Sequence, residues 1–194
     1  MSRIQQLYGG AMSMAVPAGM EDVSAVREIP DHQEVFANSM TDQSIIVEIL
    51  ETAAEHEEAR SALVHHFNEL ARANDAEEPA PIGRTEQLPH AGAEAYALVG
   101  EQRVAKFNEA EKAADAVNTV CVMLALIRVP PPHSADILVS LNVPLRIGHG
   151  SSSYEPSSSS SSSQTLSAAD TEAAYAEFKA MVGTLRINDY GLFA

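Results

Sequence analysis

The side chains of this 194-residue sequence that could do chemistry are mainly carboxylates, and they are concentrated between residues 7 and 51. Two apolar runs there flank a segment rich in turn residues, which contains Asp22, Asp31 and Glu34. If Asp31 begins a turn, Glu34 lies three residues further along and on the same side of the chain. Exposed carboxylates grouped in this way suit the binding of a basic protein surface, because they attract it over a distance.

Two neighbouring charged residues have simpler alternatives to partner contact. Asp22 is placed to cap a short helical element over residues 22–27, in which Val23 and Val26 would share a buried side. Arg27 is the lone cation of this segment, and its alternative role is a local salt bridge that holds the turn, which contributes little to stability at a surface.

The sequence motifs of common enzyme sites do not accompany these carboxylates. There is no Gly-rich phosphate loop, His-Glu-x-x-His pair, cysteine cluster or nucleophile elbow, and Gly148-His149-Gly150-Ser151 merely opens a low-complexity stretch. His65 and His66 are adjacent, so they point about 100° apart on a helix, whereas two metal ligands are better placed four residues apart. We therefore expect no catalytic residue, no metal and no cofactor, and a binding protein rather than an enzyme.

The formal charge of −15 is unevenly distributed along the chain. Residues 1–58 contain eleven acidic and two basic side chains, and so carry −9 of the total. Because phosphate backbones are repelled by such a surface, nucleic acid is not an expected partner. The alternative is that the negative charge only keeps the protein soluble.

Length and cysteine usage indicate a single domain without disulfides. A chain of this size buries a sufficient core as one domain. Cys121 is the only cysteine, and its neighbours Val120 and Val122 indicate a small core residue. No apolar run approaches the roughly 20 residues of a membrane span, and Gly9 and Gly10 interrupt any signal-peptide core. We expect a soluble, intracellular monomer that does not bind membranes.

The elements that must position the carboxylates follow from the hydrophobic pattern. We expect strands at residues 11–16, 34–37, 44–50, 96–107, 117–129, 135–144 and 185–188, and amphipathic helices at 57–73 and after a capping box at 167–170. The strand 117–129 is apolar on both faces and must be covered on both. The three prolines at 130–132 separate it from 135–144 by a short connection, which predicts an antiparallel pair.

Two segments are expected to lack regular structure. Residues 74–92 are polar and contain three prolines, which predicts a long loop. Residues 148–166 include two serine runs that cannot bury apolar surface, so we expect a flexible surface insertion in the domain spanning 1–194. The resulting fold class is α/β (α+β), a mostly antiparallel sheet of about six strands with helices on both faces.

The stretch from residue 7 to 51 resembles the Ran guanine-nucleotide release factor family, small acidic α/β proteins that bind the GTPase Ran. The resemblance is carried by the order and spacing of several segments, and it returns at 104–108, 125–128, 136–144 and 192–194. The segments in the first stretch are Tyr8-Gly9-Gly10-Ala11, Val16-Pro17-Ala18-Gly19, Asp22-Val23-Ser24, Val26-Arg27-Glu28-Ile29-Pro30-Asp31, Gln33-Glu34-Val35-Phe36 and Asp42-Gln43-Ser44-Ile45-Ile46-Val47-Glu48. It implies an α/β/α sandwich, a fold shared with a photosystem II extrinsic subunit.

The resemblance also implies a function and a site. Asp31 and Glu34 correspond to acidic positions implicated in binding Ran, and Gln33, Asp42 and Gln43 match motif positions without an assigned role. With Asp22 and Arg27, these residues are the candidate contacts. The implied function is release of guanine nucleotide from Ran in nuclear protein import, by a protein of the nucleus and cytoplasm. The alternative is an acidic adaptor that binds Ran or another basic partner without accelerating release.

The sequence also departs from the family pattern. His32 stands where relatives have other polar residues, the helix at 57–73 matches poorly, and the serine insertion has no recognised counterpart. These departures leave the acidic segment intact as the expected site.

Overall fold

The computed structural model describes residues 2–77, 80–90, 92–105, 117–148 and 168–193. Its main feature is a seven-stranded antiparallel sheet with the strand order β3-β4-β5-β9-β8-β7-β6. The strands are β3 (Glu21–Asp22), β4 (Gln33–Asn38), β5 (Gln43–Glu51), β6 (Ile82–Gln87), β7 (Glu94–Ala105), β8 (Val117–Val129) and β9 (Ala135–Arg146). The expected fold class is confirmed.

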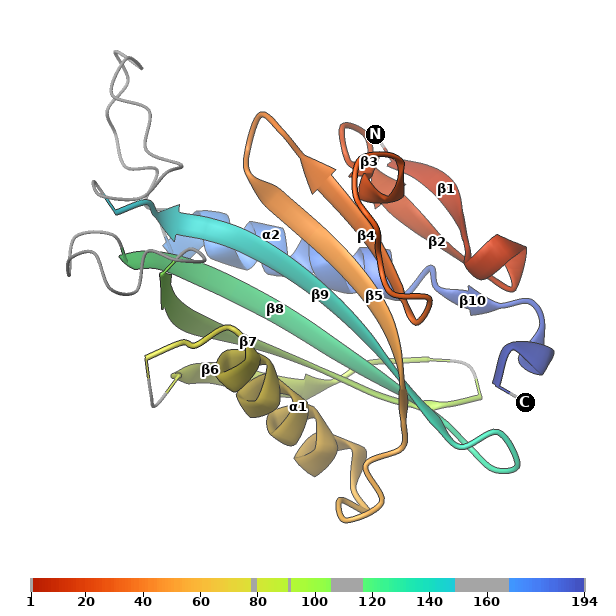
Figure 1. Cartoon of the computed structure of the whole chain (residues 1–194). Coiled ribbons are helices and arrows are strands. Elements are labelled where there is room, and N and C mark those ends of the chain that lie inside the picture. Colours follow the sequence, from red (N-terminus) through yellow and green to blue (C-terminus); the bar gives the residue numbers. More distant parts are fainter. Residues whose placement is uncertain (1, 78–79, 91, 106–116, 149–167, 194) are drawn as a thin grey trace.

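A smaller antiparallel sheet joins the two ends of the chain. It consists of β1 (Ser2–Leu7), β2 (Met12–Pro17) and β10 (Arg186–Ile187), in the order β1-β2-β10. Short 3-10 turns lie at η1 (Tyr8–Gly10), η2 (Val23–Ala25) and η3 (Tyr190–Phe193). Figure 1 shows this sheet beside the β3–β4 end of the large one.

The two helices cover opposite faces of the large sheet (Figure 1). Helix α1 (Ala59–Ala73) buries Leu63 and Phe67 against Leu98 and Leu124. Helix α2 (Ala168–Val182) buries Tyr175, Phe178 and Val182 on the other side, in a core completed by Met12, Met14 and Val16 of β2. The small sheet is therefore part of the same layer as α2.

Strand β8 is buried on both faces, as its sequence predicts. Val122 and Leu124 belong to the core under α1, whereas Cys121 and Met123 belong to the core under α2 and β2. Burial, together with the charge of Glu101, raises the pKa of Cys121 to about 11, so its thiol stays protonated at neutral pH. The prolines at 130–132 join β8 to β9 as the expected antiparallel pair.

Several expectations are wrong for identifiable reasons. Residues 74–92 contain β6, whose weak alternation is stabilised as a strand by pairing with β7. Strand β1 was not expected from its polar sequence and forms by pairing with β2. Val26 is 82% exposed rather than buried, because η2 ends at Ala25 and does not continue to a second turn. The serine-rich insertion at 148–166 and the capping residue Ser167 lie outside the described residues, apart from Gly148.

Candidate functional site

The acidic segment forms one edge of the large sheet. Strand β3 is only two residues long and pairs Asp22 with Phe36, so much of β4 has no strand beyond it. On its inner side β4 pairs with β5, which places Glu34 opposite Val47 and Gln33 opposite Glu48. The register therefore brings Glu48 next to the expected residues, and we define the acidic edge as Asp31, Glu34 and Glu48.

Tyr8 anchors this edge to the small sheet. Its backbone amide donates a hydrogen bond of 2.6 Å to Oε1 of Glu34, and its hydroxyl is 2.8 Å from the carbonyl oxygen of Val47 and 3.0 Å from that of His32. Burial raises the pKa of Tyr8 above its usual value, and the carboxylates of Glu34 and Glu48 raise it further. The phenol thus remains a neutral hydrogen-bond donor.

The conformation of Tyr8 is unusual for a residue with a side chain. Its φ is 49°, and Gly9 and Gly10 that follow also have positive φ, at 64° and 98°. Two glycines accommodate this conformation readily, because they lack a Cβ atom. The Tyr-Gly-Gly motif is the sequence signal for this anchor, although its contact with Glu34 could not be read from it.

Glu34 differs from the exposed carboxylate that its sequence position predicts. It is half-buried, and one carboxylate oxygen is committed to Tyr8. Among the described residues, Oε2 of Glu34 accepts no hydrogen bond. Glu34 therefore combines a structural contact with one oxygen that remains available to a partner.

Asp31 is exposed in the turn that leads into β4. The turn is closed by a 2.8 Å hydrogen bond from the Gln33 amide to the Pro30 carbonyl. Within the described ranges, the Asp31 carboxylate has neither a hydrogen bond nor an ion pair. It is the most accessible negative group of the acidic edge.

Glu48 is held by two neighbouring polar side chains. Nε2 of Gln33 donates to Glu48 Oε1 at 2.7 Å, and Nε2 of His32 lies 3.4 Å from the same oxygen. Glu48 retains 23% exposure of its side chain. Gln33, a candidate contact without an assigned role in the sequence, thus positions this carboxylate.

Asp22 and Arg27 lie in the segment that precedes the turn. Asp22 caps η2, since its Oδ1 accepts a 2.8 Å hydrogen bond from the Ser24 amide, which confirms the capping alternative. The alternative role of Arg27, a local salt bridge, is not observed, because its exposed guanidinium makes no ion pair with any described residue.

Asp42 and Gln43 occupy the opposite end of the β4–β5 hairpin. Gln43 pairs with Asn38, five residue pairs from the pair of Gln33 with Glu48. At the rise of a β-strand this separation is roughly 17 Å. The structure therefore does not bring these two residues together with the acidic edge, and one compact contact would not include all seven candidates.

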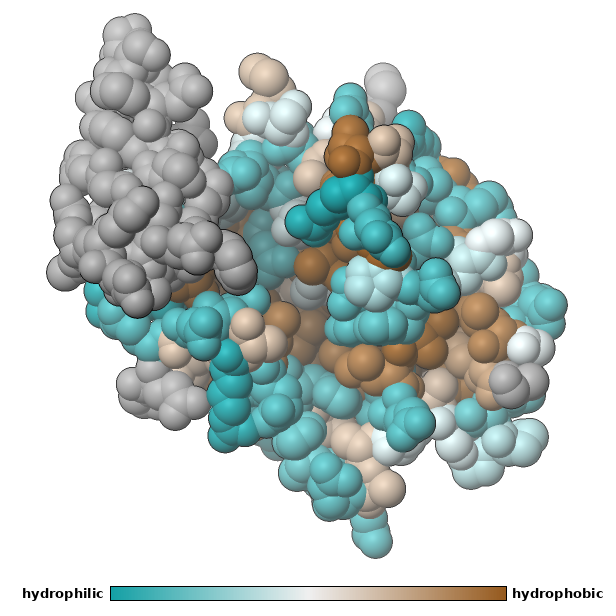
Figure 2. All heavy atoms as spheres, in the orientation of Figure 1, coloured by the Kyte–Doolittle hydropathy of each residue, from teal (hydrophilic) through white to brown (hydrophobic). Residues whose placement is uncertain are grey.

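A part of the sheet face beside the acidic edge lies outside the cover of α1. Helix α1 contacts β7 and β8, whereas β5 and β9 present Ser44, Ile46 and Asn142 as half-buried side chains. Nδ2 of Asn142 donates to Oγ of Ser44 at 3.2 Å. Figure 2 shows hydrophilic residues over the β3–β4 segment and a hollow between this segment and α1. The acidic edge thus borders a recessed surface of mixed polarity.

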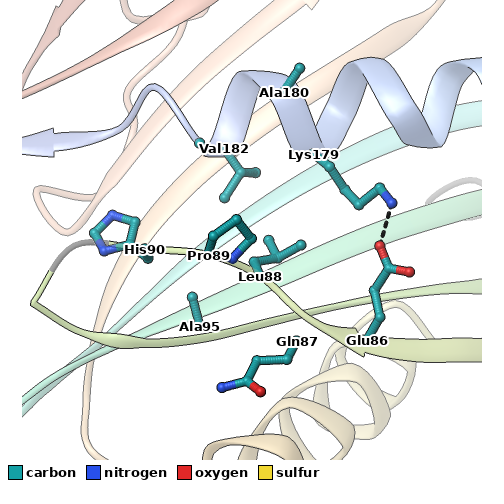
Figure 3. Close-up of a pocket in the computed structure, with 10 residues that line it drawn as sticks. Glu86, Gln87, Leu88, Pro89, His90, Ala95, Lys179, Ala180 and Val182 are labelled. Atoms are coloured by element: carbon teal, nitrogen blue, oxygen red, sulfur yellow. Dashed lines mark hydrogen bonds and ion pairs between the residues drawn. The ribbon is translucent and has the colours of Figure 1, made fainter.

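A separate pocket of about 260 Å³ lies between the β6–β7 connection and α2. Figure 3 shows Leu88, Pro89 and Val182 lining it, with an ion pair between Lys179 and Glu86 at one side. These two charges neutralise each other. None of the candidate residues lies in this pocket. Among the described residues, neither helix has the length and hydropathy of a membrane-spanning segment.

Comparison with known proteins gives one consistent result. The model of the family of Ran-interacting Mog1 proteins matches residues 5–144. The Ran guanine nucleotide release factor of Danio rerio is 37% identical over 96% of this chain and 97% of its own length. The nuclear import protein MOG1 of Saccharomyces cerevisiae is 32% identical over 97% of this chain and 84% of its own length.

The fold agrees with the sequence match. The crystal structure of the Saccharomyces cerevisiae Ran-binding protein Mog1p superimposes with a TM-score of 0.72 and 26% identity, covering 100% of this chain and 99% of that one. The matched residues include both strands of the acidic edge and the Tyr8 anchor. Because the family model, the curated relatives and the fold comparison all agree, the chain belongs to the Ran-interacting Mog1 family.

Proposed function

We propose that this protein binds the GTPase Ran through the acidic edge and promotes release of its guanine nucleotide in nuclear import. The observation that carries the proposal is the exposure and hydrogen bonding of the three carboxylates of the acidic edge. Asp31 is exposed without a partner among the described residues, while Glu34 and Glu48 are fixed by Tyr8 and Gln33. Prearranged carboxylates favour binding, because little side-chain freedom remains to be lost.

The electrostatics favour a mechanism of competition with phosphate. A GTPase holds its nucleotide through a loop lysine, backbone amides and a magnesium ion. Carboxylates of the acidic edge would stabilise the cationic groups that the phosphates leave, or repel the phosphates and disturb the magnesium ion. Coupling is reciprocal, so the factor by which this protein weakens nucleotide binding equals the factor by which nucleotide weakens its own binding.

The proposal has further parts, which the names of the relatives support only in outline. The protein acts as a regulator rather than as an enzyme, as a single chain, in the nucleus and cytoplasm. The charge of −15 disfavours nucleic acid and anionic membrane surfaces as partners. The contacts with Ran are expected at Asp31, Glu34 and Glu48, with Gln33 positioning the last of these.

The decisive experiment measures release of fluorescent GDP and GTP analogues, separately, from Ran while this protein is titrated in. We expect acceleration that saturates. The double variant Asp31→Asn, Glu34→Gln removes two charges but keeps the side-chain shapes, and it should weaken Ran binding at least about tenfold, or about 1.4 kcal/mol. Glu177→Gln, which removes an exposed carboxylate from α2, is the matched control and should have no effect.

Each other result has a defined meaning. Binding without acceleration would identify an adaptor and refute the release function. Acceleration that is unchanged in the double variant would place the contact elsewhere on the molecule. Absence of both binding and acceleration would overturn the proposed partner.

A further inference from the structure

We propose a site for a divalent transition metal, with Zn²⁺ as the best-fitting ion, formed by Glu55, His56 and His65. One ligand atom from each of these side chains lies within 4.8 Å of the other two. Glu55 and His56 belong to the connection between β5 and α1, and His65 belongs to α1 itself. The site is thus distinct from the acidic edge.

The donor set has the chemistry of a zinc site. Two imidazoles and one carboxylate bind Zn²⁺ at about 2.0–2.2 Å, and water completes a tetrahedral shell when the protein supplies three ligands. Ligand atoms in such a shell are about 3.4 Å apart. The ligand atoms of the exposed Glu55 and the half-buried histidines need to approach one another by at most about 1.4 Å to reach this geometry.

The backbone of His56 is held in place by buried groups. Nη1 of Arg128 donates to the His56 carbonyl at 2.6 Å, and the His56 amide donates to the Ala53 carbonyl at 3.0 Å. The Ala53 amide in turn donates to Oδ2 of Asp136 at 3.2 Å, and Asp136 is fully buried and paired with Arg128. A connection tied to the sheet in this way presents His56 to α1 in a defined position.

The side chains are also oriented for binding. Nδ1 of His56 lies 2.9 Å from Oγ of Ser61, a contact that leaves Nε2 of His56 as the ligand atom and fixes its tautomer when Nδ1 is the donor. The His56 and His65 rings are 4.6 Å apart between centroids, and His65 has no hydrogen-bond partner among the described residues. The ring of His66 lies further from His65, at 5.6 Å between centroids, and its Nε2 is 3.2 Å from Asp136, so His56 is the better placed second ligand.

The surroundings provide access for an ion. A hollow of about 420 Å³ adjoins His56 and His65 and is also lined by Glu58, Ser61 and Arg60. Glu55, Glu57 and Glu58 outnumber Arg60 in this stretch of the sequence, a charge balance that favours a cation. Bound metal would link the β5–α1 connection to the helix that it precedes.

Calorimetric titration of the full chain with Zn²⁺ tests the proposal. We expect one strongly bound ion per chain, and a loss of at least tenfold in affinity in His56→Gln and in His65→Gln. His133→Gln, in the β8–β9 turn, is the matched control and should bind as the parent chain does. Co²⁺ should give the visible absorption of a tetrahedral complex, which each of the two histidine changes removes.

Thermal unfolding separates loss of the site from loss of the fold. Zn²⁺ should raise the melting temperature of the parent chain and of His133→Gln, but not of His65→Gln, because a ligand of the native state stabilises it. Ser61→Ala keeps all three ligands and should weaken binding less than His65→Gln. Zinc affinity that survives both histidine changes, or that falls equally in His133→Gln, would overturn the proposal.

Discussion

The backbone amide of Tyr8 and the carboxylate of Glu34 form a 2.6 Å hydrogen bond that joins the small sheet to the edge of the large one. The contact spans 26 residues of sequence and is accompanied by a bifurcated hydrogen bond from the Tyr8 hydroxyl to the carbonyls of Val47 and His32. The acidic edge is therefore held in place by hydrogen bonds between the two sheets. Substitutions of Glu34 that test binding will also change stability, and the two effects have to be separated.

Replacing Glu34 by Ala should reduce stability as well as Ran binding. The change removes a charged acceptor and leaves the Tyr8 amide without its partner, which costs about 1.5–3 kcal/mol. Glu34→Gln retains an acceptor oxygen and should cost less. Asp31→Ala, at an exposed carboxylate without a described partner, should remain within about 0.5 kcal/mol of the parent. Urea unfolding measures all three, and equal losses in Glu34→Ala and Asp31→Ala would contradict this assignment.

Replacing Tyr8 by Phe should lower the free energy of unfolding by about 1 kcal/mol at neutral pH, because the carbonyls of His32 and Val47 lose their shared hydroxyl donor. The pKa of Tyr8 is raised in the folded protein, so the phenol ionises first in the unfolded chain. Its contribution to stability is thus complete below pH 10 and is lost as the pH rises above that value.

The pH dependence provides the control for this variant. Urea unfolding between pH 8 and 11 should show the parent losing stability more steeply than Tyr8→Phe. The difference in free energy of unfolding between the parent and Tyr8→Phe should therefore become smaller at high pH. A difference that stays constant over this range would mean that the hydroxyl is not held as the structure describes.

The buried group formed by Asp136, Arg128 and His66 should dominate the response to acid. Burial alone would raise the pKa of Asp136, but hydrogen bonds from Arg128, His66 and the Ala53 amide, with the charge of Arg128, lower it to about 2. The folded-state pKa lies below the unfolded value of 3.8, so the stabilisation is present above pH 4 and is lost as the pH falls towards 2. It amounts to about 2 kcal/mol.

Asp136→Asn tests this account directly. At pH 7 the change leaves Arg128 without its buried counter-ion and should cost about 3–5 kcal/mol. The loss should shrink as the pH falls from 4 towards 2, where the parent carboxylate also becomes protonated. Urea unfolding at pH 7 and near pH 2 measures the free energy of unfolding of the variant and the parent, with Asp31→Asn as an exposed control. An equal loss of stability at the two pH values would contradict the lowered pKa of Asp136.

Gly100 should tolerate no side chain. A Cβ atom there would lie 2.6 Å from Cζ of Phe67 and 2.8 Å from the Pro81 carbonyl oxygen. Gly100→Ala should therefore cost about 1–3 kcal/mol through overpacking under α1. Gly83→Ala on the paired strand is the matched control, because its nearest contact is 3.4 Å. Thermal unfolding compares them, and a Gly100 variant as stable as the Gly83 variant would contradict the packing described.

Strands with a strong local signal could be predicted from the sequence. The apolar residues on both faces of β8 predicted its bounds and its double burial, and Ile45, Ile46 and Val47 favoured the strand β5. Strand β6 could not be predicted, because Gly83, Arg84 and Glu86 give little strand propensity and its state depends on pairing with β7.

The acidic edge could be predicted in composition but not in geometry. The spacing of Asp31 and Glu34 indicated one surface, yet the burial of Glu34 depends on Tyr8, which is distant in sequence. Glu48 belongs to the acidic edge because the register of the β4–β5 pair places it opposite Gln33. The same register places Asp42 at the far end of the hairpin, away from the other carboxylates. Contacts of this kind arise from long-range pairing and have no local sequence pattern.

The small sheet has a consequence for the order in which the chain folds during synthesis. Strand β2 pairs with β10 through Ser13 and Arg186, and the Ala11 carbonyl accepts a hydrogen bond from the Asn188 amide. Strand β2 is therefore synthesised well before its partners β10 and α2. Until then the apolar side of β2, with Met12 and Met14, lacks α2. We expect nascent chains that end before α2 to bind chaperones through the β1–β2 hairpin, and to release them once α2 and β10 emerge.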